Sequence, residues 1–315
     1  MPKLDIKKFN VATMGKNKTV LVIGKRGSGK SFLLRDIMYH KRDVPLGLVF
    51  SPTEEVNQFF GKFIPRLFIH HQYDPAVMQG LEKRQTKLIR GIEKNKLPAD
   101  IDARAFIILD DCMADAKEWK NDKYVRRCLF NWRHLQCDLA CITLQSPVGT
   151  VGPEMRDQFD YVFLFYTPSM IQQEKLYKYY ASMFPTKQMF YKAFSVLTEN
   201  HGCLVIKNTG AQSNKLEDIV YWYRAEMHDD FKVGHPEIWK YNETYLRQEE
   251  EEEEEDMDTS LEFYNKLNEK NGGNVQINPL PAPDDNSSGE GSSSSDSSSK
   301  KNRRHKHRNK HRNKY

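Results

Sequence analysis

Two hydrophobic patterns divide the first 245 residues. Short, continuous apolar runs are typical of strands buried on both faces of a parallel sheet. They occupy residues 19–23, 46–50, 105–109, 139–144 and 161–165, with shorter strand signals at 67–70, 203–206 and 219–223. Apolar residues recur at helical spacing over 31–40, 75–96, 122–136, 171–183 and 186–198. Strands that alternate with helices predict one α/β domain with a mainly parallel central sheet.

The chain changes character after residue 245. Residues 249–256 are eight consecutive acids, residues 287–299 are mostly serine, and residues 301–315 repeat Lys-His-Arg-Asn. Such segments hold too little apolar surface to offset the entropy that a chain loses on ordering. We therefore expect an ordered domain over 1–245 and a disordered acidic, serine-rich and basic tail over 246–315.

Charge divides at the same boundary. The tail holds 12 Lys and Arg against 15 Asp and Glu, which gives a formal charge of −3. Residues 1–245 hold 36 basic and 28 acidic residues and therefore carry +8. A basic domain suits a polyanionic partner, although ordinary enzymes also reach this charge.

Cysteines and apolar runs indicate the compartment. The five cysteines form no C-x-x-C pair, which predicts buried, reduced thiols rather than a disulfide framework or a zinc site. No apolar run approaches the ~18 residues of a membrane span, and the first residues show no signal peptide. We expect a protein of a reducing, nucleotide-rich compartment, without a transmembrane segment.

Residues 24–31, Gly-Lys-Arg-Gly-Ser-Gly-Lys-Ser, match the phosphate-binding loop pattern G-x-x-x-x-G-K-[ST]. The loop lies between an apolar strand and a helix, as the motif requires. Its glycines let backbone N–H groups face the phosphates, its lysine adds positive charge, and its serine hydroxyl joins the Mg²⁺ shell. ATP and Mg²⁺ are the predicted cofactors. The predicted nucleotide-binding residues are Gly24, Gly27, Ser28, Gly29, Lys30 and Ser31.

Polar residues that end two later strands supply the second half of the predicted site. Asp110 follows the apolar run 105–109 and is expected to hold Mg²⁺ through water, whereas Asp111 is placed to polarise an attacking water. The alternative for Asp111 is a turn or helix-cap residue. Gln145 ends the next strand and is expected to contact the γ-phosphate or the water, with a plain polar strand end as the alternative.

An arginine from a neighbouring subunit can stabilise the charge on a transferring phosphoryl group. Arg133, just before the strand of Gln145, is the first candidate, and Arg156 is the second. Surface solvation is the alternative for each of them. Arg126 and Arg127 are interpreted as a solvated helix face.

In order, these motifs resemble the FtsK–HerA superfamily of DNA-pumping ATPases, and within it the genome-packaging ATPases of poxviruses and other nucleocytoplasmic large DNA viruses. The resemblance covers roughly residues 18–225. It depends on the loop with Lys30-Ser31, on Ile-Ile-Leu-Asp110-Asp111, on Trp-Arg133-His134, on Thr-Leu-Gln145-Ser, on Arg156 and on Tyr-Val-Phe-Leu-Phe165.

The resemblance implies a RecA-like core, a pentameric or hexameric ring, and ATP-driven movement of double-stranded DNA into a capsid. It implies phosphate and Mg²⁺ binding by Lys30 and Ser31, metal binding by Asp110, a base at Asp111 and a γ-phosphate sensor at Gln145. Many members of the superfamily carry Glu where this chain has the shorter Asp111. The implied partners are DNA and capsid or inner-membrane virion proteins, and the implied locations are virus factories in the host cytoplasm and the virion.

A charged helix is the candidate DNA contact of such a motor. It carries Lys83, Arg84, Lys87, Arg90 and Lys94, and a plain solvent-exposed helix is the alternative. Basic groups there would hold DNA through its phosphates without reading the sequence.

Three other functions fit part of the sequence. A P-loop kinase for a small molecule or nucleotide would need an arginine-rich lid, which is not evident. A GTPase-like switch or scaffold usually has D-x-x-G and N-K-x-D, whereas here Asp110 is followed by Asp-Cys-Met and Asn95-Lys-Leu-Pro98 lacks the aspartate. A non-packaging DNA translocase or helicase of the same superfamily would share the site chemistry.

Overall fold

The computed structural model describes residues 4–146, 151–210, 213 and 215–247. The predicted disordered tail lies outside these residues from position 248 onwards. No helix in the described part of the chain has the length and the apolar character needed to span a membrane.

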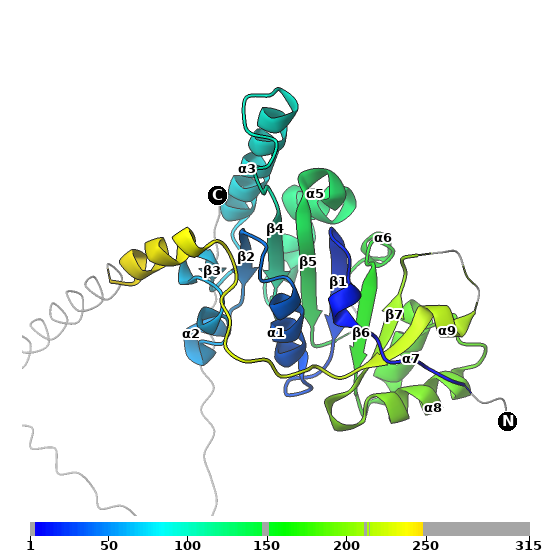
Figure 1. The fold of residues 1–315 in the computed structure, drawn as a ribbon. Helices are drawn as coiled ribbons and strands as arrows, with labels where there is room; N and C mark the ends of the chain where they lie inside the picture. Colours follow the sequence, from blue (N-terminus) through cyan, green and yellow to red (C-terminus); the bar gives the residue numbers. More distant parts are fainter. Residues whose placement is uncertain (1–3, 147–150, 211–212, 214, 248–315) are drawn as a thin grey trace, which may run out of the picture. The chain divides into compact units, whose positions relative to one another are not determined.

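An eight-stranded sheet forms the centre of the described domain, in the order β3-β2-β4-β5-β1-β6-β7-β8 (Figure 1). Its first six strands are all parallel, whereas β7 and β8 pair antiparallel at one edge. The predicted mainly parallel α/β sheet is confirmed. The strands are β1 (Lys18–Ile23), β2 (Leu46–Phe50), β3 (Ile69–His70), β4 (Ala105–Leu109), β5 (Cys137–Leu144), β6 (Tyr161–Phe165), β7 (Cys203–Lys207) and β8 (Val220–Tyr223).

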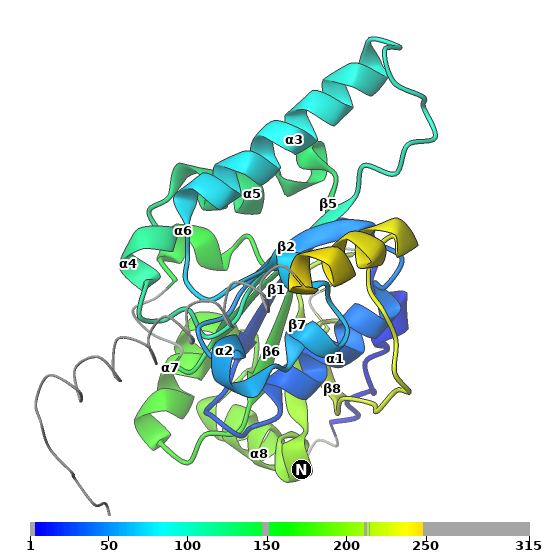
Figure 2. The same cartoon turned by 90° about the vertical axis from the view of Figure 1, so that its left-hand side faces the viewer.

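Helices cover both faces of this sheet (Figure 2). The α-helices are α1 (Lys30–His40), α2 (Glu54–Asn57), α3 (Pro75–Glu93), α4 (Ala116–Trp119), α5 (Lys123–Asn131), α6 (Pro153–Arg156), α7 (Met170–Tyr180), α8 (Lys187–Leu197) and α9 (Leu216–Ile219). Short 3₁₀ segments are η1 (Val11–Thr13), η2 (Phe60–Lys62), η3 (Arg66–Phe68), η4 (Trp132–Leu135) and η5 (Glu199–His201). Residues 236–247 are also helical.

Side chains that alternate along each central strand build two cores. Val20 and Val22 of β1 join the core on the α1 face, whereas Leu21 and Ile23 join the core under α3, α5, α7 and α8. Successive side chains of a strand point to opposite faces, so a strand that is covered on both faces must be apolar throughout. This requirement explains the unbroken apolar runs of the sequence.

Three predicted elements differ from the structure. The strand expected over 67–70 is reduced to two residues, because η3 occupies its first half. The helix expected over 122–136 ends at Asn131 and continues as η4, and Gln136 then takes a left-handed φ of 49°. The polar lead-in before β1 is also packed, since the backbone of Phe9 bonds to Trp222 O and its side chain is buried with Val11 and Met14.

Gly47 in β2 supports the close approach of two strands. A Cβ added at Gly47 would lie 2.3 Å from Cγ of Phe106, a buried core ring on the neighbouring β4. We expect Gly47→Ala to lower the free energy of unfolding by about 1–3 kcal/mol, as overpacking does. Chemical denaturation measures the change.

Gly80→Ala is the matched control for this substitution. Gly80 is exposed on α3, and nothing lies within 4 Å of an added Cβ. Alanine favours a helix over glycine, so this variant should gain about 0.5–1 kcal/mol. Equal effects of the two substitutions would contradict the packing argument.

Candidate active site

The carboxyl ends of three adjacent strands meet at one edge of the sheet. β5 pairs with β1 on one side and with β4 on the other, so the residues that follow these strands become neighbours. The backbone N–H of Gly24 extends this pairing by donating to Leu144 O over 2.9 Å. The phosphate-binding loop, the acid pair and Gln145 are therefore brought together at this edge.

The loop has the backbone conformation that its glycines permit. Gly27 and Gly29 adopt φ angles of 74° and 109°, which L residues with side chains rarely adopt. Lys30 begins α1, and its ammonium donates to Gly24 O at 2.7 Å and to Lys25 O at 3.1 Å. The Ser28 hydroxyl is buried and has no hydrogen-bond partner among the described residues. This open cradle with its cation fits a phosphate chain.

Asp110 and Asp111 are joined through the hydroxyl of Thr143 on β5. Thr143 Oγ1 donates to Asp110 Oδ1 at 2.6 Å and accepts from the backbone N–H of Asp111 at 3.0 Å. This bridge was not predicted from the sequence. A polar residue inside an otherwise apolar strand, two positions before Gln145, was the signal that could have found it.

Burial shifts the pKa values of Lys30 and Asp110. Desolvation lowers the pKa of Lys30, and the negative charges of Asp111 and Asp110 oppose that shift. Desolvation raises the pKa of Asp110, against the hydrogen bond from Thr143 and the charge of Lys30. The carboxylate and the ammonium therefore lie within electrostatic reach in a water-poor site. Asp110 and the Ser31 hydroxyl are the oxygen donors that could hold Mg²⁺.

Asp111 has one constrained and one free carboxylate oxygen. Oδ2 accepts from Gln145 Nε2 at 2.5 Å, whereas Oδ1 is buried and has no hydrogen-bond partner among the described residues. Asp111 also forms a turn, with φ of 55° and its carbonyl accepting from Met113 N at 2.8 Å. The turn orients the side chain of Asp111. Asp111 is therefore a turn residue, as in the alternative interpretation, and its carboxylate still lies in the site.

Neither candidate arginine lines the pockets beside the phosphate-binding loop or bonds to the acid pair in the described part of the chain. Arg133 in η4 precedes β5 and lines a hollow of about 290 Å³ at the amino ends of the strands, 3.8 Å from Asp160 Oδ1. Its side chain is 72% exposed. Arg156 stacks on Tyr179, with its guanidinium carbon 4.0 Å from the ring centroid. Neither completes the site in its own subunit, so a role in trans remains a prediction for both.

A pocket of about 340 Å³ adjoins the loop, within the range of small-molecule sites. Segments far apart in the sequence build its walls, which is why the sequence analysis missed them. Nδ1 of His201 lies 3.3 Å from Ser28 O, and Arg224 and Met227 approach from beyond β8. Its lining residues are Gly27, Gly29, Lys30, Ser31, Phe32, Asn200, His201, Arg224, Ala225 and Met227.

Similar proteins come from large DNA viruses. No family model matches the chain. It is 36% identical over 224 residues to uncharacterized protein L437 of Acanthamoeba polyphaga mimivirus, covering 71% of this chain and 78% of that protein. It is 31% identical over 246 residues to uncharacterized protein 075L of Invertebrate iridescent virus 6, covering 76% and 91%.

A solved structure is more distantly similar. The genome packaging NTPase B204 from Sulfolobus turreted icosahedral virus 2, in complex with sulfate, aligns with 69% of this chain and 100% of its own. The sequence identity is 14% and the TM-score is 0.46.

Thr143→Val tests the hydroxyl bridge with a substitution of nearly equal shape. We expect kcat for ATP hydrolysis to fall by about 10–100-fold, the usual cost of losing a group that orients a metal-binding carboxylate. KM for ATP should change little, because the phosphate-binding loop is intact. Steady-state kinetics measure both constants.

Thr19→Val is the control for Thr143→Val. Thr19 is also a buried strand threonine with a bonded hydroxyl, but it lies at the opposite end of β1, against Gln158 O and Asp160. It should lose stability without a specific loss of kcat. Similar kinetics for the two variants would contradict the role of Thr143.

Asp110→Asn should abolish hydrolysis and stabilise the fold. The pKa of Asp110 is raised in the folded protein, so its ionised form destabilises the fold wherever the pH exceeds that raised pKa. We expect Tm at pH 8 to rise by about 2–4 °C, a usual size for one stabilising substitution.

The Tm difference between this variant and the wild type should shrink as the pH falls through the raised pKa. Below the unfolded pKa the acid is protonated in both states, and the substitution then removes no charge. Thermal unfolding of both proteins across pH measures this. A variant that is less stable at pH 8 would contradict the desolvation argument.

Proposed function

We propose that this chain, which belongs to the same family as the mimivirus and iridescent virus proteins, is an ATP-driven motor that moves double-stranded viral DNA into a capsid. The order of its motifs, which resembles that of the FtsK–HerA superfamily, supports this proposal. The mainly parallel α/β sheet and the phosphate-binding loop support ATP binding and hydrolysis by a P-loop enzyme. Movement of DNA is proposed in addition to hydrolysis.

The observation that most supports hydrolysis is Oδ1 of Asp111, which bonds to none of the residues that the structure describes. Gln145 holds the other carboxylate oxygen and thereby orients the group. A carboxylate with one free lone-pair set can accept a proton from a water aligned with the γ-phosphate. Mg²⁺, when bound, supplies charge neutralisation at the phosphate oxygens.

Other residues of the chain position the reacting groups. The Lys30 ammonium exchanges its hydrogen bonds to loop carbonyls for contacts to the phosphates. The hydrogen bond from the Thr143 hydroxyl holds the Asp110 carboxylate toward the metal site. Gln145 contacts Asp111 and would respond to the presence of the γ-phosphate. Because neither Arg133 nor Arg156 reaches this site, we propose that an arginine of an adjacent subunit completes it in a ring.

The second half of α3 supports a polyanionic partner. The last buried residue of α3 is Gln85, just past the middle of the helix, and the helix then continues beyond α5 (Figure 2). Residues 83–96, here called the basic arm, line a groove of about 660 Å³. Besides Arg127, the exposed cations of this groove are Lys83, Lys87, Arg90, Lys94 and Lys96.

These cations form no ion pair with any carboxylate in the described part of the chain. The one acid that lines the groove, Glu82, is buried and paired with Arg127 at 2.5 Å. Arg84, which the sequence placed in the same set, is half-buried and bonded to Gln85. A row of unneutralised cations on an exposed helix is suited to the phosphates of DNA.

ATP hydrolysis by the full-length protein, with and without double-stranded DNA, tests the proposed function. We expect DNA to stimulate turnover, and we expect Lys30→Ala and Asp111→Asn to abolish it, because the first removes the phosphate contact and the second removes the base. Asp157→Asn, a substitution of the same kind away from the site, is the control.

Turnover that is indifferent to DNA would contradict the motor and leave the nucleotide site in place. Phosphate transfer from ATP to a small molecule, in place of its release, would favour the kinase alternative.

The double variant Lys87→Gln/Arg90→Gln tests the basic arm. We expect weaker binding to DNA of any sequence, and a salt dependence of log K lowered by about 2, close to one for each lost phosphate contact. Fluorescence anisotropy at several salt concentrations measures both. The control is Lys187→Gln/Lys240→Gln, which removes two exposed lysines elsewhere. Equal slopes for the two double variants would contradict a DNA contact at the arm.

A further inference from the structure

A strap of chain, residues 224–235, leaves β8 and crosses the outer side of α1 (Figure 1). Arg35 of α1 donates to His228 O at 2.8 Å. Further along the strap, Val233 N donates to Phe63 O and Gly234 N donates to Arg42 O. The strap is thus attached to the helix that begins at the phosphate-binding loop.

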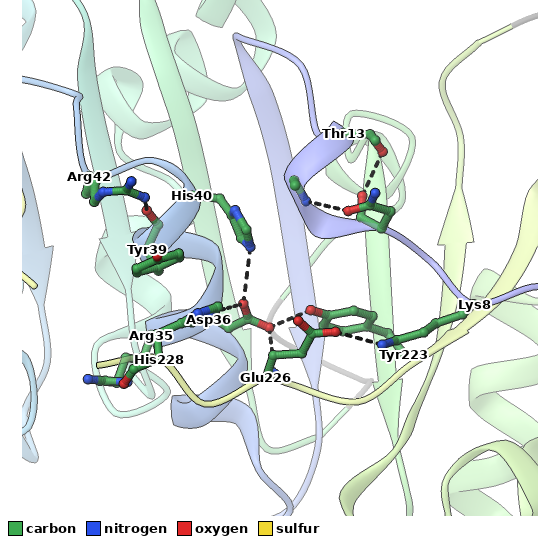
Figure 3. A network of polar contacts seen from close by, with 12 residues as sticks. Lys8, Thr13, Arg35, Asp36, Tyr39, His40, Arg42, Tyr223, Glu226 and His228 are labelled. Atoms are coloured by element: carbon green, nitrogen blue, oxygen red, sulfur yellow. Dashed lines mark hydrogen bonds and ion pairs between the residues drawn. The ribbon is translucent and has the colours of Figure 1, made fainter. Parts of the chain in front are cut away.

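A buried carboxylate lies under the middle of the strap (Figure 3). Asp36 of α1 is 0% exposed. Its Oδ2 accepts from Tyr223 Oη at 2.6 Å and from the backbone N–H of Glu226 at 2.9 Å. Oδ1 faces two imidazoles, with Nε2 of His228 at 2.6 Å and Nε2 of His40 at 3.6 Å.

These three side chains present a set of metal-binding atoms. Asp36 and His40 are four residues apart on α1 and therefore share one face of the helix. His228 comes from the strap, and its ring stacks on Tyr39 with the centroids 3.7 Å apart. The three ligand atoms, Asp36 Oδ1 and the two Nε2 atoms, lie within 4.8 Å of one another.

The chemistry of the donors selects the kind of ion. Two imidazoles and one carboxylate suit Zn²⁺ and similar first-row divalent ions, whereas Mg²⁺ and Ca²⁺ prefer an all-oxygen shell. Ligands that lie about 2.0–2.2 Å from one Zn²⁺ are roughly 3–4 Å apart from each other. The distance between Asp36 Oδ1 and His228 Nε2 therefore increases slightly when the ion binds. His40 is 25% exposed, which lets water complete the coordination.

We propose that Asp36, His40 and His228 bind one Zn²⁺ ion that fastens the strap to α1. The hydrogen bonds from Tyr223 and Glu226 to Oδ2 leave Oδ1 as the ligand atom and orient the carboxylate. Arg224 and Met227, next to the fastened residue, line the pocket beside the phosphate-binding loop. The ion therefore holds one wall of that pocket, apart from the predicted Mg²⁺ position at Asp110.

The test is zinc titration of the full-length protein after chelator treatment. The basic end of the tail, residues 301–315, carries His305, His307 and His311, which could bind metal by themselves. All three are therefore replaced by glutamine in every protein tested. Calorimetry should give one ion per chain, and thermal unfolding should show a higher Tm with Zn²⁺. Both results should persist in Asp111→Asn, because the acid pair is a separate site.

His40→Gln and His228→Gln each remove a ligand of the ion. Each should therefore weaken zinc binding by more than about 10–100-fold, the usual effect of losing a residue that only orients a ligand. His71→Gln, at an exposed histidine outside the cluster, should bind as before. Should either ligand variant fail to fold, X-ray absorption of the zinc-loaded parent protein counts its imidazole ligands, and two are expected.

Three results would each overturn the proposal. The first is the absence of a stoichiometric ion in the parent protein. The second is unchanged zinc affinity in His228→Gln, and the third is fewer than two imidazoles around the ion. In each case the three side chains form a hydrogen-bond network that holds the strap without a metal.

Discussion

The pairing of β5 with both β1 and β4 is the constraint on which the candidate active site depends. β1 carries the phosphate-binding loop and β4 carries the acid pair, and the two strands do not touch. β5 fixes their register and contributes Thr143 and Gln145 between them. A shift of one residue in β5 would turn these two polar side chains to the opposite face of the sheet. Fold and site are therefore set by the same backbone hydrogen bonds.

Burial makes this site both costly and effective. Lys30 and Asp110 are largely removed from water, and desolvation disfavours the charged form of each. In the same surroundings, the attraction between opposite charges is stronger than it is in water. Hydrogen bonds from Lys30 to the loop carbonyls and from the Thr143 hydroxyl to Asp110 offset part of this desolvation cost. They keep both charges in position for a nucleotide.

Much of the fold could be read from the chain because local patterns there agree with tertiary position. The runs at 105–109 and 161–165 are strands within those bounds, since a strand covered on both faces must be apolar throughout. The predictions were weaker where a short segment depends on its neighbours. η3 shortened the expected strand at 67–70, and the polar-looking start of the chain packs Phe9 against aromatic rings of β6 and β8.

By itself, the sequence determined the phosphate-binding loop, the buried strands and the acid pair, because each depends on residues adjacent in the chain. Only the tertiary structure brought Thr143 to Asp110, and His228 to Asp36, 192 residues away. It buried Oδ1 of Asp111 where no described residue bonds to it. It also decided that Arg133 lies at the far ends of the strands. Such contacts follow from strand order and chain crossings, which residue spacing does not encode.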